Sequence, residues 1–198
     1  MIGTTTQTCW LVRHGESTWN VLGLAQGHCD QARLTARGGV QARAVAEQLA
    51  DRPVGALYAS DLHRAVETAA PVAAALGLAV TLDARLRERC LGVLEGTPLA
   101  AIGPEVNGIR ANRVVDPGAR PDGGESLRDF YQRVAAFADD LAARRDPGEV
   151  VVVAHGGTLR MLTACREGVP VERMRWDPLG NGCVLRSCAP SRIERIAE

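Results

Sequence analysis

The chain has 198 residues, of which 46% are hydrophobic and 23% charged, and its equal numbers of basic and acidic side chains give a formal net charge of zero. This length suits one globular domain with a sizeable core, and the composition argues against long disordered segments. Zero net charge provides no global field that would draw the protein to nucleic acid or to an anionic membrane, so any anion must be recognised locally.

The first predicted element is a buried strand over residues 8–14, with the sequence TCWLVRH. It ends in Arg13 and His14, and Gly15 directly after them allows the backbone to turn sharply into the next element. A strand that delivers two polar side chains to the edge of a sheet is more typical of a functional site than of a plain turn.

Between residues 35 and 83 the apolar pattern predicts alternating helices and strands. The first helix starts after Thr35, whose hydroxyl is a favourable N-cap, and the second is kinked at Pro71 and ends at Gly77. The four predicted elements are a helix over 35–52, a strand over 54–60, a helix over 62–77 and a short strand over 78–83.

Residues 97–124 are rich in glycine, proline and asparagine and show little periodicity, so we expect a loop-rich, partly helical lid over one edge of the sheet. Regular elements resume after this segment. We predict an amphipathic helix over 125–145, the strongest strand of the chain over 149–157, a helix over 158–168 and a hairpin around 180–188.

Strands that alternate with helices predict an α/β fold, with a mostly parallel central sheet flanked by helices on both faces. We expect residues 1–198 to form a single domain that includes the lid segment. In sheets of this kind, ligands bind beyond the carboxyl ends of the strands. Two of the predicted strands place a histidine at that edge, because they lead into His14 and His155.

A lone histidine after a strand is usually a structural residue. Two histidines at matching strand ends, each followed by glycine, favour a functional site instead. We therefore predict that His14 and His155 face each other across a pocket. The amides of the glycines that follow, such as Gly156, and the N-termini of the next helices would form an anion site there.

Five segments, in order along the chain, carry a resemblance to a known family. They read LVRHGESTWN at 11–20, QGHCD at 26–30, SDLHRAVETA at 60–69, LRERCLGVLEG at 86–96, and GGES at 123–126 together with VVAHGG at 152–157. In these segments the sequence resembles the histidine phosphatase superfamily, in its phosphoglycerate-mutase-like branch. The resemblance implies a phosphoglycerate-mutase-like α/β fold and an enzyme that transfers a phosphoryl group.

The resemblance also implies a role for each matched residue. His14 matches the nucleophile that forms a phosphohistidine, and Glu88 matches the general acid. Arg13, Arg64 and His155 match the residues that bind the phosphoryl oxygens. The remaining residues that we assign to phosphate or substrate binding are Asn20, Gln26, Gly27 and Gly156.

The residue types of the chain fit this chemistry. It contains no lysine, which excludes a P-loop lysine and a pyridoxal Schiff base and makes every fixed cation an arginine suited to phosphate. Phosphoryl transfer spreads charge over the equatorial oxygens, so arginines and a second imidazole can stabilise it without a metal ion. A neutral His14 can attack phosphorus, and a protonated Glu88 can protonate the leaving alkoxide. We therefore expect no metal and no cofactor.

The branch of the family sets the expected reaction. Its cofactor-dependent mutases are usually longer and carry an acid segment that reads R-H-Y-G, whereas this chain is short and reads RERCLGVLEG. We therefore predict a metal-independent phosphomonoester hydrolase that acts on a small phosphorylated metabolite. A mutase-type phosphotransferase and a non-catalytic relative that binds phosphate esters remain alternatives. The sequence has no G-x-S-x-G nucleophile elbow, which disfavours a serine hydrolase.

Several other charged residues receive lesser roles. We expect Arg160 to be structural, and His28 and His63 to lie outside the chemistry. The lid contains arginines at 110, 113 and 120, and we hypothesise that one of them contacts a second anionic or polyhydroxylated part of the substrate. These three residues are Arg110, Arg113 and Arg120.

The remaining expectations concern location and assembly. The first residues, MIGTTTQT, lack a charged signal region, and no apolar run approaches the length of a membrane span, so we expect a cytoplasmic protein. The six cysteines show no metal-ligand spacing, and we expect mostly buried thiols rather than a disulfide framework. The sequence does not identify the natural substrate, because sugar phosphates, phosphoglycerate-type esters and ribazole phosphate all fit a phosphate pocket. It does not identify the oligomeric state, because no feature marks a self-complementary interface.

Overall fold

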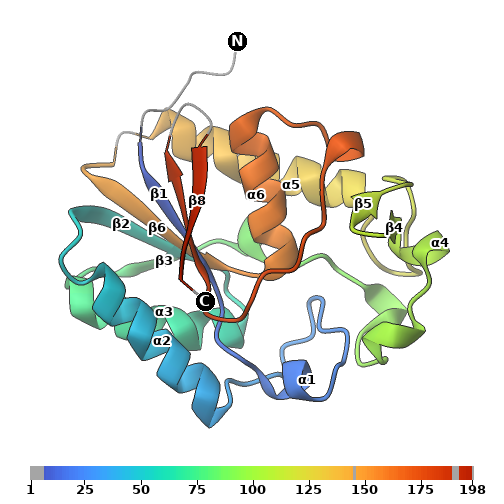
Figure 1. Ribbon diagram of the computed structural model, residues 1–198, viewed down its shortest axis with the longest axis horizontal. Helices are drawn as coiled ribbons and strands as arrows, with labels where there is room; N and C mark the ends of the chain where they lie inside the picture. The colour runs from blue at the N-terminus through green and yellow to red at the C-terminus, as the bar shows by residue number, and fades with distance from the viewer. Residues whose placement is uncertain (1–6, 145, 189–191, 198) are drawn as a thin grey trace.

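The computed structural model describes residues 7–144, 146–188 and 192–197, and its centre is a six-stranded sheet (Figure 1). The order of strands across the sheet is β3-β2-β6-β1-β7-β8. The strands are β1 (Cys9–Arg13), β2 (Val54–Ala59), β3 (Val80–Leu82), β6 (Glu149–Ala154), β7 (Val184–Cys188) and β8 (Arg192–Ala197). The first four in this order pair in parallel, and β7 and β8 pair antiparallel at one edge. The predicted mostly parallel α/β sheet is confirmed.

Helices cover both faces of the sheet, as predicted (Figure 1). Helices α2 (Ala36–Leu49) and α3 (His63–Leu76) pack on one face, and α5 (Leu127–Ala143) and α6 (Gly156–Glu167) pack on the other. No helix among the described residues is long and apolar enough to cross a membrane.

The main helices begin and end at residues with clear local signals. The hydroxyl of Thr35 accepts a hydrogen bond from the Gly38 amide at 3.0 Å and so caps α2. Gly77 adopts a left-handed conformation, with φ of 65°, and ends α3, which runs through Pro71. A capping box between Ser126 and Asp129 starts α5. These local signals are strong enough that the predicted starts of α2 and α5 and the end of α3 agree with the structure to within two residues.

The valine run of β6 is buried on both sides, which holds the two helix layers to the sheet. Val150 and Val152 pack in the core under α5 and α6, whereas Val151 and Val153 pack in the core under α2 and α3. Side chains alternate between the faces of a strand, so a continuous apolar run is needed where both faces are covered. This buried strand fixes the position of the residue that follows it, His155.

The segment 97–124 contains short elements rather than one long loop. They are a 3₁₀ turn at Leu99–Ala101, helix α4 (Pro104–Asn107), and a two-stranded hairpin of β4 (Ile109–Arg110) and β5 (Arg113–Val114). The hairpin turn uses positive φ angles at Ala111 and Asn112. In Figure 1 this segment lies at the right of the view, beyond the first turn of α5.

The predicted hairpin around 180–188 is displaced in the structure. Only its second half forms a strand, β7, whose hairpin partner is the later strand β8. The glycine-rich start of the segment makes a different turn, in which Gly182 has φ of 71° and its amide donates to the carbonyl groups of Arg13 and His14 at 3.2 Å. The turn therefore packs against the end of β1. None of the six cysteines forms a disulfide, and two are buried while four are half-buried.

Candidate active site

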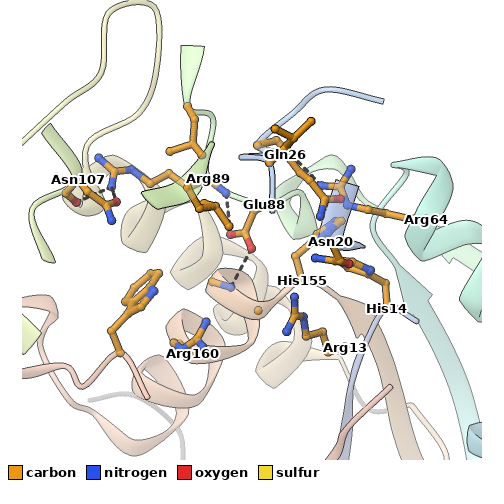
Figure 2. Close-up of a pocket in the computed structure, with 17 residues that line it drawn as sticks. Arg13, His14, Asn20, Gln26, Arg64, Glu88, Arg89, Asn107, His155 and Arg160 are labelled. Atoms are coloured by element: carbon orange, nitrogen blue, oxygen red, sulfur yellow. Dashed lines mark hydrogen bonds between the residues drawn. The ribbon is translucent and has the colours of Figure 1, made fainter. Parts of the chain in front are cut away.

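Two histidines meet where the parallel strands β1 and β6 end. Strand β1 pairs with β6 so that Arg13 lies opposite Ala154, which makes the next residues, His14 and His155, neighbours. Their ring centroids are 5.2 Å apart, and the rings are tilted by 60°. The two imidazoles face the same cavity at the carboxyl edge of the sheet (Figure 2), where ligands of such sheets usually bind.

A cavity of about 240 Å³ lies over this edge. All nine residues that the sequence analysis assigns to catalysis or binding line it. They are Arg13, His14, Asn20, Gln26, Gly27, Arg64, Glu88, His155 and Gly156. The cavity wall also contains eight residues that were not assigned: Leu24, Arg89, Leu91, Leu99, Asn107, Gly157, Arg160 and Trp176.

His14 is held as a neutral imidazole. Its Nδ1 lies 2.7 Å from the Gly15 carbonyl oxygen, an acceptor, so Nδ1 carries the ring proton and Nε2 keeps its lone pair. Burial, followed by the charges of Arg64 and Arg13, lowers the pKa of His14 well below 6.5. An unprotonated Nε2 in a cavity lined by cations is what a nucleophile toward phosphorus requires.

Gly15 is needed for close packing rather than for a left-handed turn. A Cβ at this position would lie 2.4 Å from the Gly38 carbonyl oxygen, and Gly15 is absent from the glycines with positive φ. The reciprocal contact at Gly38 would place a Cβ 2.1 Å from the Glu16 carbonyl oxygen. The start of α2 therefore packs directly on the backbone that follows His14.

Two arginines bring unused donors to the cavity. Arg64, in the first turn of α3, donates to the Gly27 and Cys29 carbonyls at 2.9 and 3.0 Å, and Arg13 donates to the Leu179 carbonyl. The Nε of each arginine has no partner among the described residues. Burial lowers the pKa of Arg64 to about 10, so its guanidinium stays protonated at neutral pH. Buried cations with spare N–H groups form a site for an anion.

Glu88 enters the cavity from the loop that follows a 3₁₀ turn at Ala84–Leu86. Its carboxylate accepts hydrogen bonds from the Gly157 and Arg89 amides, both at 2.9 Å. A Cβ on Gly157 would lie 2.1 Å from Oε1 of Glu88. The glycine is therefore necessary for the first turn of α6 to hold the carboxylate.

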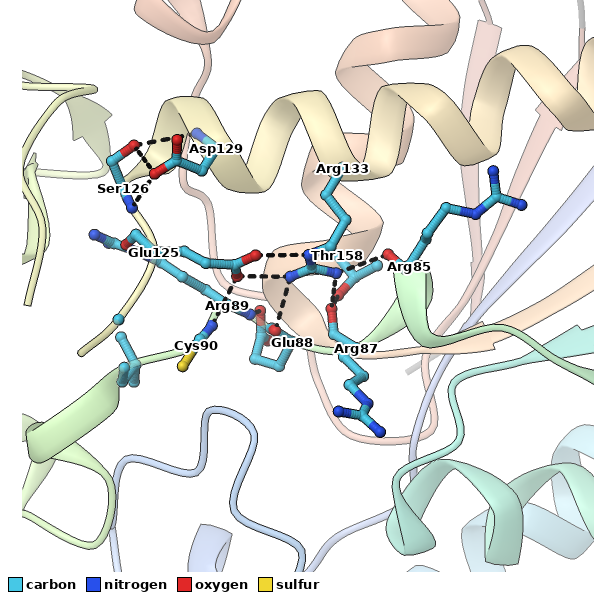
Figure 3. Close-up of polar contacts among 12 residues, drawn as sticks. Arg85, Arg87, Glu88, Arg89, Cys90, Glu125, Ser126, Asp129, Arg133 and Thr158 are labelled. Atoms are coloured by element: carbon cyan, nitrogen blue, oxygen red, sulfur yellow. Dashed lines mark hydrogen bonds and ion pairs between the residues drawn. The ribbon is translucent and has the colours of Figure 1, made fainter.

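The ion pair between Arg133 and Glu125 holds the loop that carries Glu88 (Figure 3). Arg133 of α5 donates to the carbonyls of Arg85, Arg87 and Glu88 at 2.7 to 3.0 Å. The same guanidinium binds both carboxylate oxygens of Glu125 at 2.7 Å. Although burial opposes it, this contact holds the pKa of Glu125 below its usual value. The charge of Arg133 is thus balanced while its donors hold the loop in place.

Asn20 and Gln26 are linked by Ser17. The hydroxyl of Ser17 lies 2.9 Å from the Asn20 Oδ1 and 3.0 Å from the Gln26 Oε1. Asn20 Oδ1 also accepts from the Ser17 amide and from Nδ2 of Asn181, each at 3.0 Å. These contacts occupy the oxygen of Asn20, so its amino group is the atom that can serve a ligand.

Arg160 was expected to be only structural, but it forms part of the cavity wall. Its Nε donates to the Asp177 carbonyl at 2.7 Å, and its guanidinium lies over the Trp176 ring at 5.1 Å. A Cβ on Gly156 would lie 3.1 Å from its Nη1. Burial lowers its pKa to about 10, so it remains a cation. The signal in the sequence is its i+4 spacing from Gly156, which places both on one face of the helix.

The polar group that the lid contributes to the cavity is an amide rather than an arginine. Asn107, at the end of α4, lines the cavity, and Arg89 donates to its backbone oxygen at 2.7 Å and to its Oδ1 at 3.0 Å. Arg89 is only 3% exposed and also donates to the carbonyls of Ala119 and Glu125, each at 2.8 Å. One buried side chain next to Glu88 therefore connects the lid to the rest of the site.

The lid arginines do not line the cavity, contrary to our hypothesis. Arg110, Arg113 and Arg120 are all exposed. Arg110 and Arg113 flank the hairpin turn, and Arg120 pairs with Asp129. His28 and His63 do not line the cavity either, as expected. His63 is paired with Asp30.

No group of three or more histidine, cysteine or acidic side chains could hold a metal ion in the part of the chain that the structure describes.

The two buried histidines predict a pH-dependent stability. Burial lowers the pKa of His14 and His155 well below 6.5 in the fold, and the unfolded chain protonates them near pH 6.5. Below that pH the unfolded state binds more protons, so the free energy of unfolding falls as the pH is lowered, with a limiting slope of about 1.4 kcal/mol per pH unit for each histidine. Urea denaturation at pH 6.5 and 5.5 measures the slope. His155→Gln should reduce this slope, and a slope equal to that of the wild type would contradict the assignment.

The comparisons with known proteins agree with this geometry. A family model described as histidine phosphatase superfamily (branch 1) matches residues 9–189. A protein of Enterobacter sp. (strain 638) named probable phosphoglycerate mutase GpmB is 37% identical over 190 residues, which cover 93% of this chain and 83% of that protein.

Solved structures with the same fold include members with both kinds of name. The mycobacterial glucosyl-3-phosphoglycerate phosphatase Rv2419c, in complex with VO3, superposes with a TM-score of 0.81 at 33% identity, covering 96% of this chain and 97% of that chain. A phosphoglycerate mutase from Thermus thermophilus superposes with a TM-score of 0.71 at 31% identity, covering 97% and 99%.

Proposed function

Because the chain belongs to branch 1 of the histidine phosphatase superfamily, we propose that it hydrolyses phosphomonoesters of small metabolites through a phosphohistidine on His14, without a metal ion. The observation that carries the proposal is the single cavity that holds two imidazoles, two buried guanidiniums with spare donors, and one carboxylate. Every group needed to bind, attack and protonate a phosphate ester faces the same space.

The first step breaks the ester bond. Arg13, Arg64 and His155 bind the phosphoryl oxygens, and Nε2 of His14 attacks phosphorus in line with the leaving oxygen. The N–P bond forms as the P–O bond of the ester breaks, and protonated Glu88 gives its proton to the leaving alkoxide. The positive donors are already in place, so little reorganisation is required in the transition state.

The second step returns the enzyme to its starting state. The Glu88 carboxylate, now unprotonated, accepts a proton from a water molecule that attacks phosphorus. The N–P bond breaks, His14 is again neutral, and inorganic phosphate leaves. The Gly15 carbonyl keeps the Nδ1 proton in place throughout, so that Nε2 is always the reacting nitrogen.

The rest of the cavity lining supports a leaving group of mixed character. Besides the groups assigned to phosphate, the cavity is lined by the apolar residues Leu24, Leu91 and Leu99 and by the polar residues Arg160 and Asn107. A guanidinium and an amide that line the same cavity suit a leaving group that carries a carboxylate or several hydroxyl groups. This feature replaces the exposed lid arginines as the basis for substrate choice.

We expect Arg160→Ala to raise KM by about tenfold or more for an ester that carries a second anion, such as a phosphoglycerate, because a charged hydrogen bond is lost. The effect on kcat should be small, and so should the effect on KM for glycerol phosphate, an ester whose leaving group is uncharged. Steady-state kinetics on both substrates measures the difference. Arg113→Ala removes an exposed lid arginine outside the cavity and is the matched control. Equal effects of the two variants would contradict the role of Arg160.

The mutase alternative draws on the name of the GpmB relatives. It differs from the proposal in the second acceptor, which is a hydroxyl group of a phosphoglycerate rather than water. The acid segment and the phosphatase neighbour at a TM-score of 0.81 favour hydrolysis.

The test is release of inorganic phosphate from a panel of phosphorylated metabolites, with EDTA present. Release that persists in the chelator supports metal-independent hydrolysis and ranks the substrates. Interconversion of phosphoglycerates in the presence of a bisphosphoglycerate, without net phosphate release, would support the mutase instead. Binding of esters with neither reaction would support the non-catalytic alternative.

A further inference from the structure

The side chain of Ser60 contacts the imidazole of His155. It follows β2, the strand next to β6, and it is fully buried. Its hydroxyl oxygen is 2.8 Å from Nε2 of His155 and 3.3 Å from the amide nitrogen of Leu62. The serine thus connects the backbone at the start of α3 to the imidazole that begins α6.

The contacts of the Ser60 hydroxyl determine which of its neighbours donates a hydrogen bond and which accepts one. The Leu62 amide can only donate, so the Ser60 oxygen accepts from it. The hydroxyl has one proton to donate, and the only acceptor that it contacts among the described residues is Nε2 of His155. If Nε2 carried the ring proton instead, the buried hydroxyl proton would have no acceptor, which is costly.

We infer that Ser60 is a positioning residue that fixes the tautomer of His155, so that Nε2 accepts from the serine and Nδ1–H points toward the phosphoryl group as a donor. This inference rests on the proposed function for the identity of the anion. The tautomer itself depends only on the contacts of the free protein.

The environment of the second ring nitrogen agrees with this assignment. Nδ1 of His155 is buried and has no partner among the described residues, although the residue lines the cavity. Burial and the neighbouring cations lower the pKa of His155 well below 6.5, so the ring carries only one proton at neutral pH. A buried N–H without a protein partner is unfavourable, and a phosphoryl oxygen bound in the cavity would accept a hydrogen bond from it.

The pair of imidazoles then has complementary roles. His14 directs its proton away from the cavity, to the Gly15 carbonyl, and offers a lone pair. His155 does the reverse, because its lone pair is used by Ser60 and its proton faces the ligand. Two rings of the same residue type, 5.2 Å apart, thus act as nucleophile and as donor because their outer partners differ.

The first measurement is the tautomer itself, from ¹⁵N NMR of protein labelled at histidine, near pH 7.5. The sequence has only four histidines, so variants at His28, His63 and His14 suffice to assign the signals of His155. We expect a protonated Nδ1 and an unprotonated Nε2 on His155, and Ser60→Ala should shift the ring toward the other tautomer. A protonated Nε2 in the wild type would overturn the inference, as would a tautomer unchanged by Ser60→Ala.

The second measurement is affinity for inorganic phosphate, by titration calorimetry. Ser60→Ala should weaken phosphate binding by about tenfold, the size of one lost hydrogen bond, and Ser60→Thr, which keeps the hydroxyl, should recover part of it. Ser187→Ala removes another buried serine hydroxyl, bonded to Arg166 and outside the cavity, and should bind phosphate as the wild type does. Equal phosphate affinity in Ser60→Ala and Ser187→Ala would overturn the inference.

These readouts separate the inference from the proposed function. A protein that releases no phosphate from any ester but shows the expected tautomer and weaker phosphate binding in Ser60→Ala upholds the role of Ser60 and refutes hydrolysis. An active phosphatase with a protonated Nε2 on His155 upholds hydrolysis and refutes the role of Ser60.

Discussion

His14→Ala is expected to lower phosphate release by a factor on the order of 10⁴ or more, the scale seen when a catalytic nucleophile is removed. The loss is large because His14 supplies the atom that bonds to phosphorus, and no other described side chain in the cavity has an unprotonated nitrogen free to attack. His155, the nearest imidazole, uses Nε2 for Ser60. The variant should still bind inorganic phosphate, since Arg13 and Arg64 remain.

The measurement combines turnover with trapping of the intermediate. Wild type quenched during reaction with a ³²P-labelled ester should carry label that is stable to alkali and lost in acid, as a phosphohistidine is, and His14→Ala should carry none. His63→Ala, an exposed histidine outside the cavity, is the matched control and should retain both turnover and label. Label or turnover that survives in His14→Ala would assign the nucleophile to another residue.

Glu88→Gln is expected to lower kcat by about 10²- to 10⁴-fold for alkyl phosphates, the usual contribution of a positioned acid. The amide is close in shape to the carboxyl group and can still contact the loop, but it cannot give a proton to an alkoxide. A nitrophenolate leaves without a proton, so the rate with 4-nitrophenyl phosphate should fall far less. The dependence on the leaving group distinguishes loss of the acid from a general disturbance of the cavity.

Steady-state kinetics with both esters provides the check. Glu167→Gln, an exposed glutamate at the end of α6, should leave both rates unchanged. A drop of the same size for the alkyl and the aryl ester in Glu88→Gln would mean that Glu88 only holds the loop in position. Arg133 and Gly157 would then remain as structural neighbours of a residue with no role in proton transfer.

The framework of the fold could be predicted because its signals are local. Thr35 and Gly77 mark the start of α2 and the end of α3 through their own backbone and side-chain preferences. The valine run of β6 indicates a strand covered on both faces, and it is the central parallel strand between β1 and β2. Each of these features depends on neighbours a few residues away.

The displaced hairpin and the lid depend on distant contacts instead. The glycine-rich segment before β7 resembles a hairpin turn, but it packs on the end of β1 and leaves the pairing to β8. The lid arginines lie in a segment whose short hairpin leaves them exposed, and no local pattern shows on which side of the lid the cavity lies. The orientation of such a segment is set by tertiary contacts.

The site residues were predictable for a different reason. His14 and His155 become neighbours through the pairing of β1 and β6, and their positions at the ends of two predicted parallel strands, each followed by glycine, are sufficient to predict this. Arg160 has no motif of its own and was assigned a structural role, although its spacing from Gly156 places it on the cavity face of α6. Ser60 lay inside a matched segment, yet its contact with His155 becomes visible only when β2 is placed beside β6.

Arg89 limits which changes in the length and backbone of the lid the protein can tolerate, in engineering or in evolution. Its guanidinium binds carbonyl oxygens of Asn107, Ala119 and Glu125, three points spread along the lid and its exit. A lid exchanged with that of a relative would have to present backbone oxygens at all three points, or it would leave a buried cation without partners right beside the acid. New substrate preferences should therefore arise more readily by changing side chains within the existing lid backbone than by inserting or deleting residues in it.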